Sequence, residues 1–390
     1  MQLRKLQDLD VAGRQVIVRV DFNVPCREGK VCDATRIDAA MPTIQYLREQ
    51  GCRIVLLTHL GKPNNPDDTH LSLRQVFDYL AERLPNVQFA PEIPGTPEAT
   101  VRSQKLRPGD VTLFENLRFH PGEQADDKVF AMSLANMGEL VVSEAFSVAH
   151  RKAASVSTLP RLLPSGAGFQ LQKEVAFLGE IIEKPKRPLV AIIGGAKIST
   201  KLPVIRTLLE HCDYVLLGGA LANTILKAQG IAVGKSLIEE NMVESVRDLS
   251  LTTNKLRVPV DVVMAAKAES SAHTTTVAVA NVPDEDLILD IGPETVELYS
   301  DILKTAAMVV WNGPMGYFEL PAFAKGTDAI AKVVAGLAAS TIAGGGETLD
   351  AINELQLGEK FTFLSTGGGA MLKFLEGKPL PGLTPLLNTA

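Results

Sequence analysis

A repeated alternation of short β-branched segments and amphipathic helical segments is the feature that most limits how this chain can fold. In the first part of the sequence the strand candidates are 15–20, 53–58, 87–90, 111–115 and 139–143. The helical segments between them are 36–50, 72–84 and 126–137. Strands that alternate with helices favour a parallel sheet covered by helices on both faces. The first part therefore predicts one doubly wound α/β domain.

The same alternation restarts after a helical segment that stops at the Pro185 to Pro188 cluster. The later strand candidates are 189–193, 214–217, 259–264, 287–291, 308–312, 339–342 and 361–364. The later helical segments lie near 200–211, 221–229, 293–304, 324–337, 347–354 and 369–376. Because single cores stop growing near roughly 250–300 residues, a chain of 390 residues is expected to form two domains. We predict two Rossmann-like doubly wound parallel-sheet domains joined by a helical hinge.

Composition excludes several classes of partner. The net charge of −6 argues against a general binder of nucleic acid or anionic membranes, because both are polyanions that attract strongly basic chains. No apolar signal region or membrane-spanning segment is visible in the sequence. The four cysteines lack metal-ligand spacing, so we read them as reduced thiols of a cytoplasmic protein.

Cationic and hydrogen-bonding residues gather at the strand exits of the first part. Asp21 and Asn23 follow the strand 15–20, at the sheet edge where open α/β proteins bind ligands. The cationic residues near these exits are Arg19, Arg36, His59, Lys62, Arg118 and Arg151. Such a group suits a small phosphorylated carboxylate, because arginine grips planar anions with two hydrogen bonds. Taken singly, each position also fits an Asx turn, a solvated arginine or a structural ion pair.

Glycine gathers instead at the strand exits of the second part. The glycine-bearing exits are 194–195, 218–219, 292, 313, 344–346 and 367–369. Glycine lets the backbone approach a ligand closely, and helix N-termini attract phosphate groups. We expect these six exits to lie along one sheet edge and, with Lys197 and Lys201, to form a nucleotide site. Isolated glycine turns are ordinary αβ-loop chemistry, so the repetition carries the prediction.

Standard catalytic motifs are absent from the sequence. The stretch from Gly230 to Ser236 resembles a P-loop, but three residues separate its glycines where the motif needs four. The chain has no G-x-G-x-x-G after a strand, no G-x-S-x-G, no H-E-x-x-H and no H-R-D. These absences argue against dehydrogenase, hydrolase, zincin and protein-kinase interpretations.

Nine motifs, in order, make the chain resemble the phosphoglycerate kinase family over essentially its whole length. They lie at 19–25, 33–37, 59–63, 115–119, 144–151, 194–201, 311–316, 344–348 and 365–370. The resemblance implies an ATP:3-phosphoglycerate 1-phosphotransferase of glycolysis, which moves the acyl phosphate of 1,3-bisphosphoglycerate to MgADP and gives 3-phosphoglycerate and MgATP. It also implies a cytoplasmic monomer whose two lobes close on their substrates.

The resemblance assigns a role to each part of the chain. A 3-phosphoglycerate-binding domain would comprise 1–170 and a C-terminal return segment, 378–390. An interdomain helix would cover 171–185, and a nucleotide-binding domain would cover 186–377. The implied phosphoglycerate ligands are Asp21, Asn23, Arg36, His59, Lys62, Arg118 and Arg151. The implied nucleotide ligands are Gly195, Ala196, Lys197, Gly219, Gly292, Asn312, Pro314, Glu319, Gly345, Gly346, Glu347 and Thr348. The groups implied to stabilise the transferring phosphoryl group are Arg36, Lys201 and the backbone of Gly367 and Gly368, with Mg²⁺ on the nucleotide held by Glu347.

Several residues depart from the family pattern. Glu347 stands where aspartate is usual, and Lys62 replaces a bidentate arginine by a point charge. Milder departures are Glu144 for aspartate, Ser147 and Val148 for glycine and threonine, and Tyr317 for a small aliphatic residue. The first two leave open a catalytically inert nucleotide-binding relative. A dinucleotide oxidoreductase is a further alternative, but its glycine fingerprint is missing.

Overall fold

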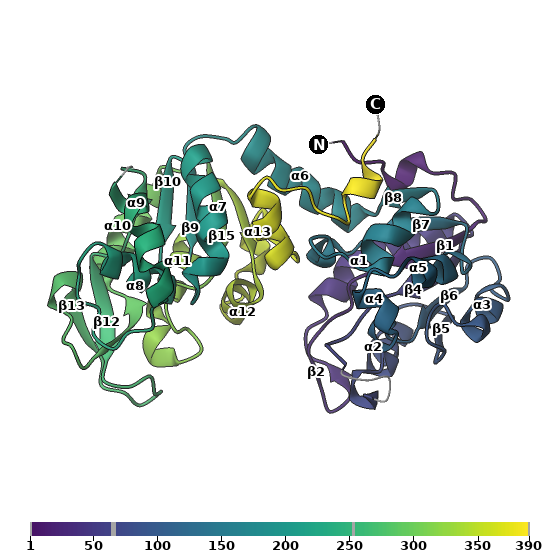
Figure 1. Ribbon diagram of the computed structural model, residues 1–390, viewed down its shortest axis with the longest axis horizontal. Helices are drawn as coiled ribbons and strands as arrows, with labels where there is room; N and C mark the ends of the chain where they lie inside the picture. The colour runs from purple at the N-terminus through teal and green to yellow at the C-terminus, as the bar shows by residue number, and fades with distance from the viewer. Residues whose placement is uncertain (1, 64–67, 252–253, 389–390) are drawn as a thin grey trace. The chain divides into compact units, whose positions relative to one another are not determined.

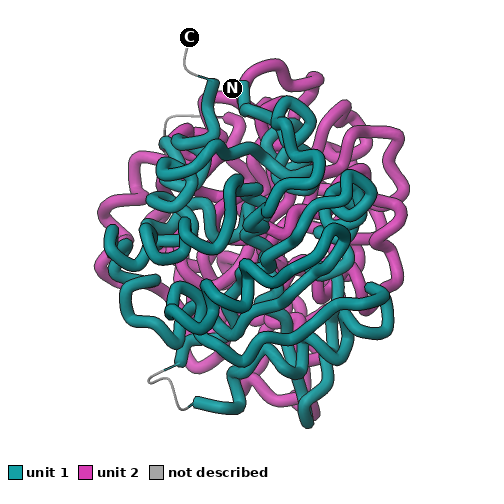
Figure 2. The backbone as a smooth tube through the Cα atoms, turned by 90° about the vertical axis from the view of Figure 1, so that its right-hand side faces the viewer, with its two compact units in different colours: residues 1–176, 379–390 teal, residues 177–378 magenta. Residues whose placement is uncertain are grey.

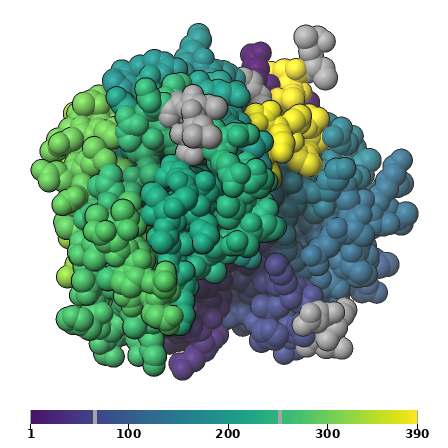
Figure 3. Space-filling model, turned by 60° about the vertical axis from the view of Figure 1, so that its left-hand side comes forward, coloured from purple at the N-terminus to yellow at the C-terminus, as the bar shows by residue number. Residues whose placement is uncertain are grey.

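The computed structural model describes residues 2–63, 68–251 and 254–388, which divide into two compact units (Figures 1 and 2). Unit 1 is Met1–Ala176 with Pro379–Ala390, and unit 2 is Phe177–Lys378. The end of the chain packs on its beginning, because Arg4 N–H donates to Leu386 O at 2.8 Å and Leu3 bridges Leu387 (Figure 3). The last two residues of the predicted return segment, 389–390, lie outside the described residues.

A six-stranded parallel sheet forms the centre of unit 1. Its strand order is β5-β6-β4-β1-β7-β8. The strands are β1 (Gln15–Arg19), β4 (Arg53–Leu57), β5 (Val87–Ala90), β6 (Val111–Phe114), β7 (Leu140–Ser143) and β8 (Ser165–Ala167). Its α-helices are α1 (Thr35–Glu49), α2 (Arg74–Ala81), α3 (Pro97–Ser103), α4 (Pro121–Gln124) and α5 (Lys128–Ala135), and a small hairpin joins β2 (Cys26–Arg27) to β3 (Lys30–Val31).

Alternate residues of the central strand β1 face two different apolar layers. Val16 and Val18 belong to one buried cluster, whereas Ile17 belongs to the other. Every residue of β1 is buried, as expected for a parallel strand with helices on both faces. This is the doubly wound arrangement that the alternation of strands and helices predicts.

Helix α6 (Phe169–Glu183) starts in unit 1 and ends in unit 2. Its first turn is fixed by Glu144, which follows β7. The Glu144 carboxylate accepts hydrogen bonds from Thr43 Oγ1 at 2.5 Å and from Gln170 N–H at 3.1 Å. Gly168 leaves room for this carboxylate, since a Cβ atom there would lie 2.0 Å from Glu144 Oε2. Burial raises the pKa of Glu144 to about 7 despite these hydrogen bonds.

Unit 2 contains a second six-stranded parallel sheet, with the order β11-β10-β9-β15-β16-β17. Its strands are β9 (Leu189–Ile193), β10 (Tyr214–Leu217), β11 (Leu256–Arg257), β15 (Met308–Asn312), β16 (Ser340–Gly344) and β17 (Phe363–Ser365). The helices of this unit are α7 (Ile198–His211), α8 (Gly219–Ala228), α9 (Val243–Leu251), α10 (Pro293–Lys304), α11 (Lys325–Ala335), α12 (Gly346–Glu354) and α13 (Gly369–Leu375). Two doubly wound parallel sheets confirm the predicted fold class.

Two predicted strands of unit 2 lie in a different sheet from the one expected. The candidates 259–264 and 287–291 become β12 (Asp261–Ala265) and β14 (Leu287–Ile291), which flank one another in an antiparallel sheet with β13 (Thr275–Ala278). The prediction that all six glycine exits share one sheet edge is therefore wrong, because Gly292 follows β14. Only three residues separate β11 from β12, which is too short for a parallel crossover and requires a change of sheet.

No helix within the described ranges is long and apolar enough to cross a membrane.

Candidate functional site

The loop after β1 is held against the end of β4. Phe22 N–H donates to Thr58 Oγ1 at 2.9 Å, and Asn23 Oδ1 accepts from Gly61 N–H at 2.8 Å. Asn23 N–H also donates to Asp21 Oδ1 at 3.1 Å, which is the local Asx turn that the sequence leaves open. The turn uses only one carboxylate oxygen of Asp21, and the second oxygen accepts hydrogen bonds from other residues.

Arg36 in the first turn of α1 contacts that second oxygen. Its Nη1 donates to Asp21 Oδ2 and to Asn23 O, both at 3.0 Å. Ser147 also donates to Asp21 Oδ2. Burial favours the neutral acid, but the positive charge of Arg36, the Ser147 hydroxyl and the charge of Arg19 outweigh it and hold the pKa of Asp21 below its ordinary value. Arg36 remains about one-third exposed, with its side chain at 34%.

A buried arginine fixes the tautomer of His59. Arg19 Nη2 lies 3.3 Å from His59 Nδ1. Since a guanidinium only donates, His59 Nδ1 must accept, and the proton of the neutral ring then sits on Nε2. Burial lowers the pKa of His59 well below its ordinary value, and the cations Arg19, Arg118 and Arg151 add to this shift against the opposing effect of Asp21. His59 is therefore a neutral hydrogen-bond donor through Nε2.

Two residues that the motifs did not single out hold Arg19 in place. Ser155 Oγ accepts from Arg19 Nε at 2.8 Å and donates to Glu123 Oε1 at 2.6 Å. The Glu123 carboxylate is 2% exposed and also accepts from Ser155 N–H at 3.0 Å. Neither Ser155 nor Glu123 lies at a strand exit, where the sequence analysis places the candidate site residues. Proximity to the site arises only when β1 and the segment Ala154–Thr158 fold together.

Three of the arginines at the strand exits of unit 1 line a cavity of about 280 Å³. Arg19, Arg118 and Arg151 contribute to its wall, together with Glu123 and Lys152. Burial and the neighbouring cations lower the pKa of Arg118 to about 10, so it remains charged at neutral pH. Three guanidiniums around one small cavity favour an anionic ligand. The other predicted ligands do not line this cavity: Asp21, Asn23, Arg36, His59 and the exposed Lys62.

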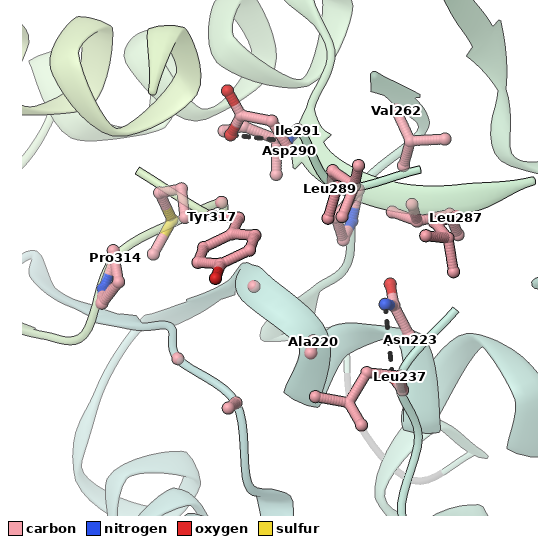
Figure 4. Close-up of a pocket in the computed structure, with 18 of the residues that line it drawn as sticks. Ala220, Asn223, Leu237, Val262, Leu287, Leu289, Asp290, Ile291, Pro314 and Tyr317 are labelled. Carbon is pink, nitrogen blue, oxygen red and sulfur yellow. Dashed lines mark hydrogen bonds between the residues drawn. The ribbon is translucent and has the colours of Figure 1, made fainter. Parts of the chain in front are cut away.

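A cavity of about 490 Å³ in unit 2 brings together about half of the predicted nucleotide ligands (Figure 4). The predicted residues that line it are Gly195, Ala196, Gly219, Pro314, Glu319 and Glu347. The predicted residues that do not line it are Lys197, Gly292, Asn312, Gly345, Gly346 and Thr348. Sequence reasoning did not assign the rest of the wall. It comes from α8 and the segment after it, from β12 and β14, and from the loop after β15, and includes Asn223, Leu237, Val262, Leu287, Leu289 and Tyr317.

Glycine at this edge allows three loops to pack backbone to backbone. Gly195 N–H donates to Pro314 O at 2.9 Å, and Gly219 N–H donates to Met315 O at 2.7 Å. Gly195 and Gly219 also adopt positive φ angles, +98° and +67°. A Cβ atom on Gly219 would lie 2.6 Å from Gly195 N. These glycines therefore shape the cavity, while their own N–H groups are already bonded within the protein.

Asn312 and Thr348 support the site from behind rather than from the cavity wall. Asn312 Nδ2 donates to Gly344 O at 2.7 Å, and Thr348 Oγ1 accepts from Gly313 N–H at 2.6 Å. Both side chains are buried. They link the ends of β15 and β16 and thereby position the start of α12, which carries Glu347.

Lys201 projects from α7 toward the ends of β9 and β15. Its Nζ donates to Gly194 O at 2.6 Å and lies 3.4 Å from Asn312 O. Burial lowers the pKa of Lys201 to about 8, and Glu347 opposes the shift. At neutral pH most Lys201 side chains are therefore charged, yet within the described residues the ammonium has no direct ion pair and is bonded to carbonyl oxygens. Such an ammonium is suited to stabilise charge that develops on a ligand.

The two predicted backbone donors after β17 differ. Gly367 N–H donates to Ser365 Oγ at 3.1 Å, so it is already used. Gly368 has a φ of +39° and directly precedes α13. No hydrogen bond from Gly368 N–H is seen within residues 2–63, 68–251 and 254–388. Of the pair, only Gly368 presents a donor to a ligand.

The donor set fits a magnesium ion that is carried mainly by a nucleotide. No cluster of three histidine, cysteine or acidic side chains suited to a metal occurs in the described part of the chain. Glu347 is exposed, lines the cavity and can supply one carboxylate oxygen. Because Mg²⁺ keeps several waters and binds substrate phosphates, one protein carboxylate is sufficient.

Known proteins resemble this chain over nearly its full length. Residues 6–378 match the family Phosphoglycerate kinase. Phosphoglycerate kinases of Moorella thermoacetica and Thermus thermophilus are each 46% identical, over 98% of this chain and 98% and 100% of their own lengths. The structure of phosphoglycerate kinase from Coxiella burnetii aligns with a TM-score of 0.88, at 36% identity and 99% coverage of both chains. That of Pyrococcus horikoshii aligns with 0.87, at 32% identity and 98% coverage of both chains. The chain belongs to the phosphoglycerate kinase family.

Proposed function

We propose that this chain catalyses the reversible transfer of a phosphoryl group from 1,3-bisphosphoglycerate to ADP, giving 3-phosphoglycerate and ATP in glycolysis. The observation that carries the proposal is the pairing of an arginine-lined cavity in unit 1 with a glycine-shaped cavity in unit 2. Each adjoins the carboxyl ends of a parallel sheet, where α/β proteins bind ligands.

Unit 1 would bind the three-carbon acid. Arg118 and Arg151 would grip its terminal phosphate, because guanidiniums match phosphate oxygens in charge and geometry. His59 would donate from Nε2 to a substrate oxygen, and Asp21 and Asn23 would accept from a hydroxyl or orient the cations. Arg36 would contact the carboxyl end, where its exposed guanidinium can follow the transferring group. Exposed Lys62 would add a more weakly directed positive charge.

Unit 2 would bind the nucleotide in its cavity of about 490 Å³, whose wall includes Gly195, Ala196, Gly219, Pro314 and Glu319. Of the predicted nucleotide ligands, Lys197, Gly292, Asn312, Gly345, Gly346 and Thr348 would act from outside that wall. Mg²⁺ on the nucleotide, held by Glu347, would neutralise phosphate charge. Lys201 would move its ammonium from the carbonyl oxygens to the oxygens of the transferring phosphoryl group, aided by the N–H of Gly368, with Gly367 shaping the loop.

The chemistry requires positioning and positive charge rather than a general base. Both nucleophiles, a carboxylate and a phosphate oxygen, are ionised at neutral pH, so no proton has to be removed. The phosphoryl group passes through a loose transition state with charge on three equatorial oxygens. Cations from both units would stabilise it, which requires the units to approach each other when both substrates are bound.

A catalytically inert relative is the alternative, and Glu347 and Lys62 are the residues that favour it. The buried Lys201 argues for activity, because a catalytically inert protein gains little from burying an ammonium that is bonded only to carbonyl oxygens. We further propose that the enzyme is cytoplasmic, since its cysteines Cys26, Cys32, Cys52 and Cys212 are free thiols, and that it is a monomer, as the family resemblance implies.

A coupled assay of ATP-dependent phosphorylation of 3-phosphoglycerate with Mg²⁺ tests the proposal. We expect turnover in the wild-type protein and a loss of at least about a hundredfold in Arg36→Ala. The matched control is Arg74→Ala, because Arg74 is an exposed arginine of the same unit paired with Asp78. Wild-type protein that binds ADP but shows no turnover would establish the inert alternative.

A further inference from the structure

Tyr317 differs from its neighbours because its ring is half-exposed while the loop that carries it is firmly held. The ring is 46% exposed, whereas Trp311 and Met315 are fully buried. Tyr317 N–H donates to Leu289 O at 2.7 Å, which ties the loop to β14. Large aromatic rings normally gain stability from burial, and this ring forgoes much of it. The fixed backbone and uncovered face leave the ring available to a ligand.

The ring forms part of the cavity wall at a point where the cavity is mainly apolar. In the view of Figure 4, Tyr317 lies between Pro314 on one side and Leu289 on the other. Val262 and Leu287 of the antiparallel sheet continue the apolar wall, and Leu237, which is 62% exposed, completes it. The glycine loops and Glu347 line the same cavity. A flat apolar space beside polar loops suits a heteroaromatic ring attached to phosphates.

We propose that Tyr317 stacks on the base of the bound nucleotide and sets a preference for purine over pyrimidine nucleoside diphosphates. The inference rests on the proposed function and deepens it, by assigning the discrimination between bases to one residue. A small aliphatic side chain, which the family pattern has at this position, offers no aromatic face. Stacking increases with ring overlap, and a purine presents two fused rings where a pyrimidine presents one.

The hydroxyl of Tyr317 is not needed for this role. Stacking depends on the face of the ring and not on the group at its edge. Tyr317→Phe and Tyr317→Trp therefore keep the interaction, whereas Tyr317→Val removes it. The surface control is Leu298→Ala, because Leu298 is also part-exposed at 37% but lies on α10 away from the cavity lining.

The first measurement is calorimetric binding of MgADP, MgCDP and inorganic pyrophosphate to the full-length variants. Tyr317→Val should weaken ADP binding by roughly 5- to 150-fold, the factor expected for one lost aromatic stack. It should weaken CDP binding less and pyrophosphate binding hardly at all, so that the purine preference shrinks. Tyr317→Phe and Tyr317→Trp should retain the preference for ADP over CDP. Equal weakening of all three ligands, or no change in ADP binding, would overturn the proposal.

A second measurement on the wild-type protein does not depend on enzyme turnover. The base protons of bound ADP should shift upfield in proton NMR, because they lie over an aromatic ring, and the shift should vanish in Tyr317→Val. An unchanged shift in that variant would place the ring away from the base and reject stacking.

Failure of the stacking proposal and failure of the proposed function give different results. If the wild-type protein phosphorylates 3-phosphoglycerate and Tyr317→Val has an unaltered KM for ADP, the stacking role is wrong and the function stands. If no phosphoryl transfer occurs but Tyr317→Val selectively loses ADP, the function is wrong and the stacking role stands. In an active enzyme we expect Tyr317→Val to raise the KM for ADP while kcat at saturating ADP stays within about twofold.

Discussion

Individual residues of the candidate site show how burial changes the chemistry of an ordinary side chain. Lys201 and His59 are both buried cationic residue types, yet they differ in charge. Lys201 retains most of its charge at neutral pH because its pKa falls only to about 8. His59 loses its charge because burial and three nearby guanidiniums act in the same direction. Each state suits the role proposed for that residue.

Lys201→Ala should reduce turnover by at least about a hundredfold while the dissociation constant of ADP changes little. The reason is that the ammonium is bonded to carbonyl oxygens in the free protein and would gain its ligand contacts during transfer. Steady-state kinetics and calorimetry measure the two quantities. Lys227→Ala, at an exposed lysine of α8, is the control. Equal losses in turnover and ADP affinity would place Lys201 in ground-state binding instead.

The tautomer of His59 can be observed directly. Long-range proton–nitrogen NMR should show a neutral ring at pH 6, with the proton on Nε2 and Nδ1 unprotonated, because Arg19 donates to Nδ1. Arg151→Ala should raise the pKa of His59, since one of the repelling cations is removed. A charged ring in the wild type at pH 6, or the opposite tautomer, would contradict the assignment.

At the scale of elements, the start of α6 shows a conflict between packing and charge. The Glu144 carboxylate occupies the space that Gly168 leaves open and accepts hydrogen bonds from the first turn of the helix. Burial nevertheless favours its protonated form, so the same contact is less favourable at high pH than at low pH.

Glu144→Gln should therefore change the pH dependence of stability. The folded pKa of about 7 lies above the ordinary value of 4.5, so the folded chain binds the proton more tightly than the unfolded chain does. The stabilisation by Glu144 is complete below about pH 4.5 and is lost as the pH rises through 7. The wild type should lose on the order of 3 kcal/mol relative to the variant between pH 5 and 8, at 1.36 kcal/mol per pKa unit. Urea denaturation of both proteins across this range measures the effect, and a stability difference between them that does not change with pH would exclude it.

Two glycine substitutions near and within α6 should have opposite effects. Gly168→Ala should destabilise the protein by about 1–3 kcal/mol, because its Cβ atom would meet Glu144 Oε2 at 2.0 Å. Gly179→Ala should stabilise it by up to about 1 kcal/mol, because Gly179 is inside the helix and a Cβ atom there meets nothing within 4 Å. Denaturant midpoints give both values, and a stabilising Gly168→Ala would show that the carboxylate moves aside.

Element identity was easier to predict than element partnership. The strands β1, β4, β9 and β15 lie where their β-branched runs indicate, because period and length are local properties. The partners of β12 and β14 depend on a short connection after β11, which is itself only Leu256–Arg257. The site shows the same division: strand exits identified Arg118 and Gly195, but Ser155 and Leu237 become site neighbours only through tertiary packing.

For the whole molecule, the proposed reaction sets a requirement on the two units. The groups proposed to hold the three-carbon acid all belong to unit 1, and those proposed to hold the nucleotide all belong to unit 2. Direct transfer requires reacting atoms about 3–3.5 Å apart. The proposal therefore demands that ligand binding control the distance between the units.

Small-angle X-ray scattering should show a smaller radius of gyration only when both 3-phosphoglycerate and a nucleotide are present. Either ligand alone contacts one unit and supplies little energy for closure. Arg36→Ala should reduce the compaction, and Arg74→Ala should not. Identical scattering curves for the free protein and the doubly liganded protein would contradict closure.

The packing of residues 379–388 with the start of the chain has a consequence for the order of folding during synthesis. Unit 2 is one continuous stretch, so all of its residues have been synthesised before the last segment of unit 1 is made. Unit 1 must wait with its edge at Leu3 and Arg4 uncovered until Leu386 and Leu387 arrive. The unit whose synthesis starts first is thus expected to be the last to finish folding.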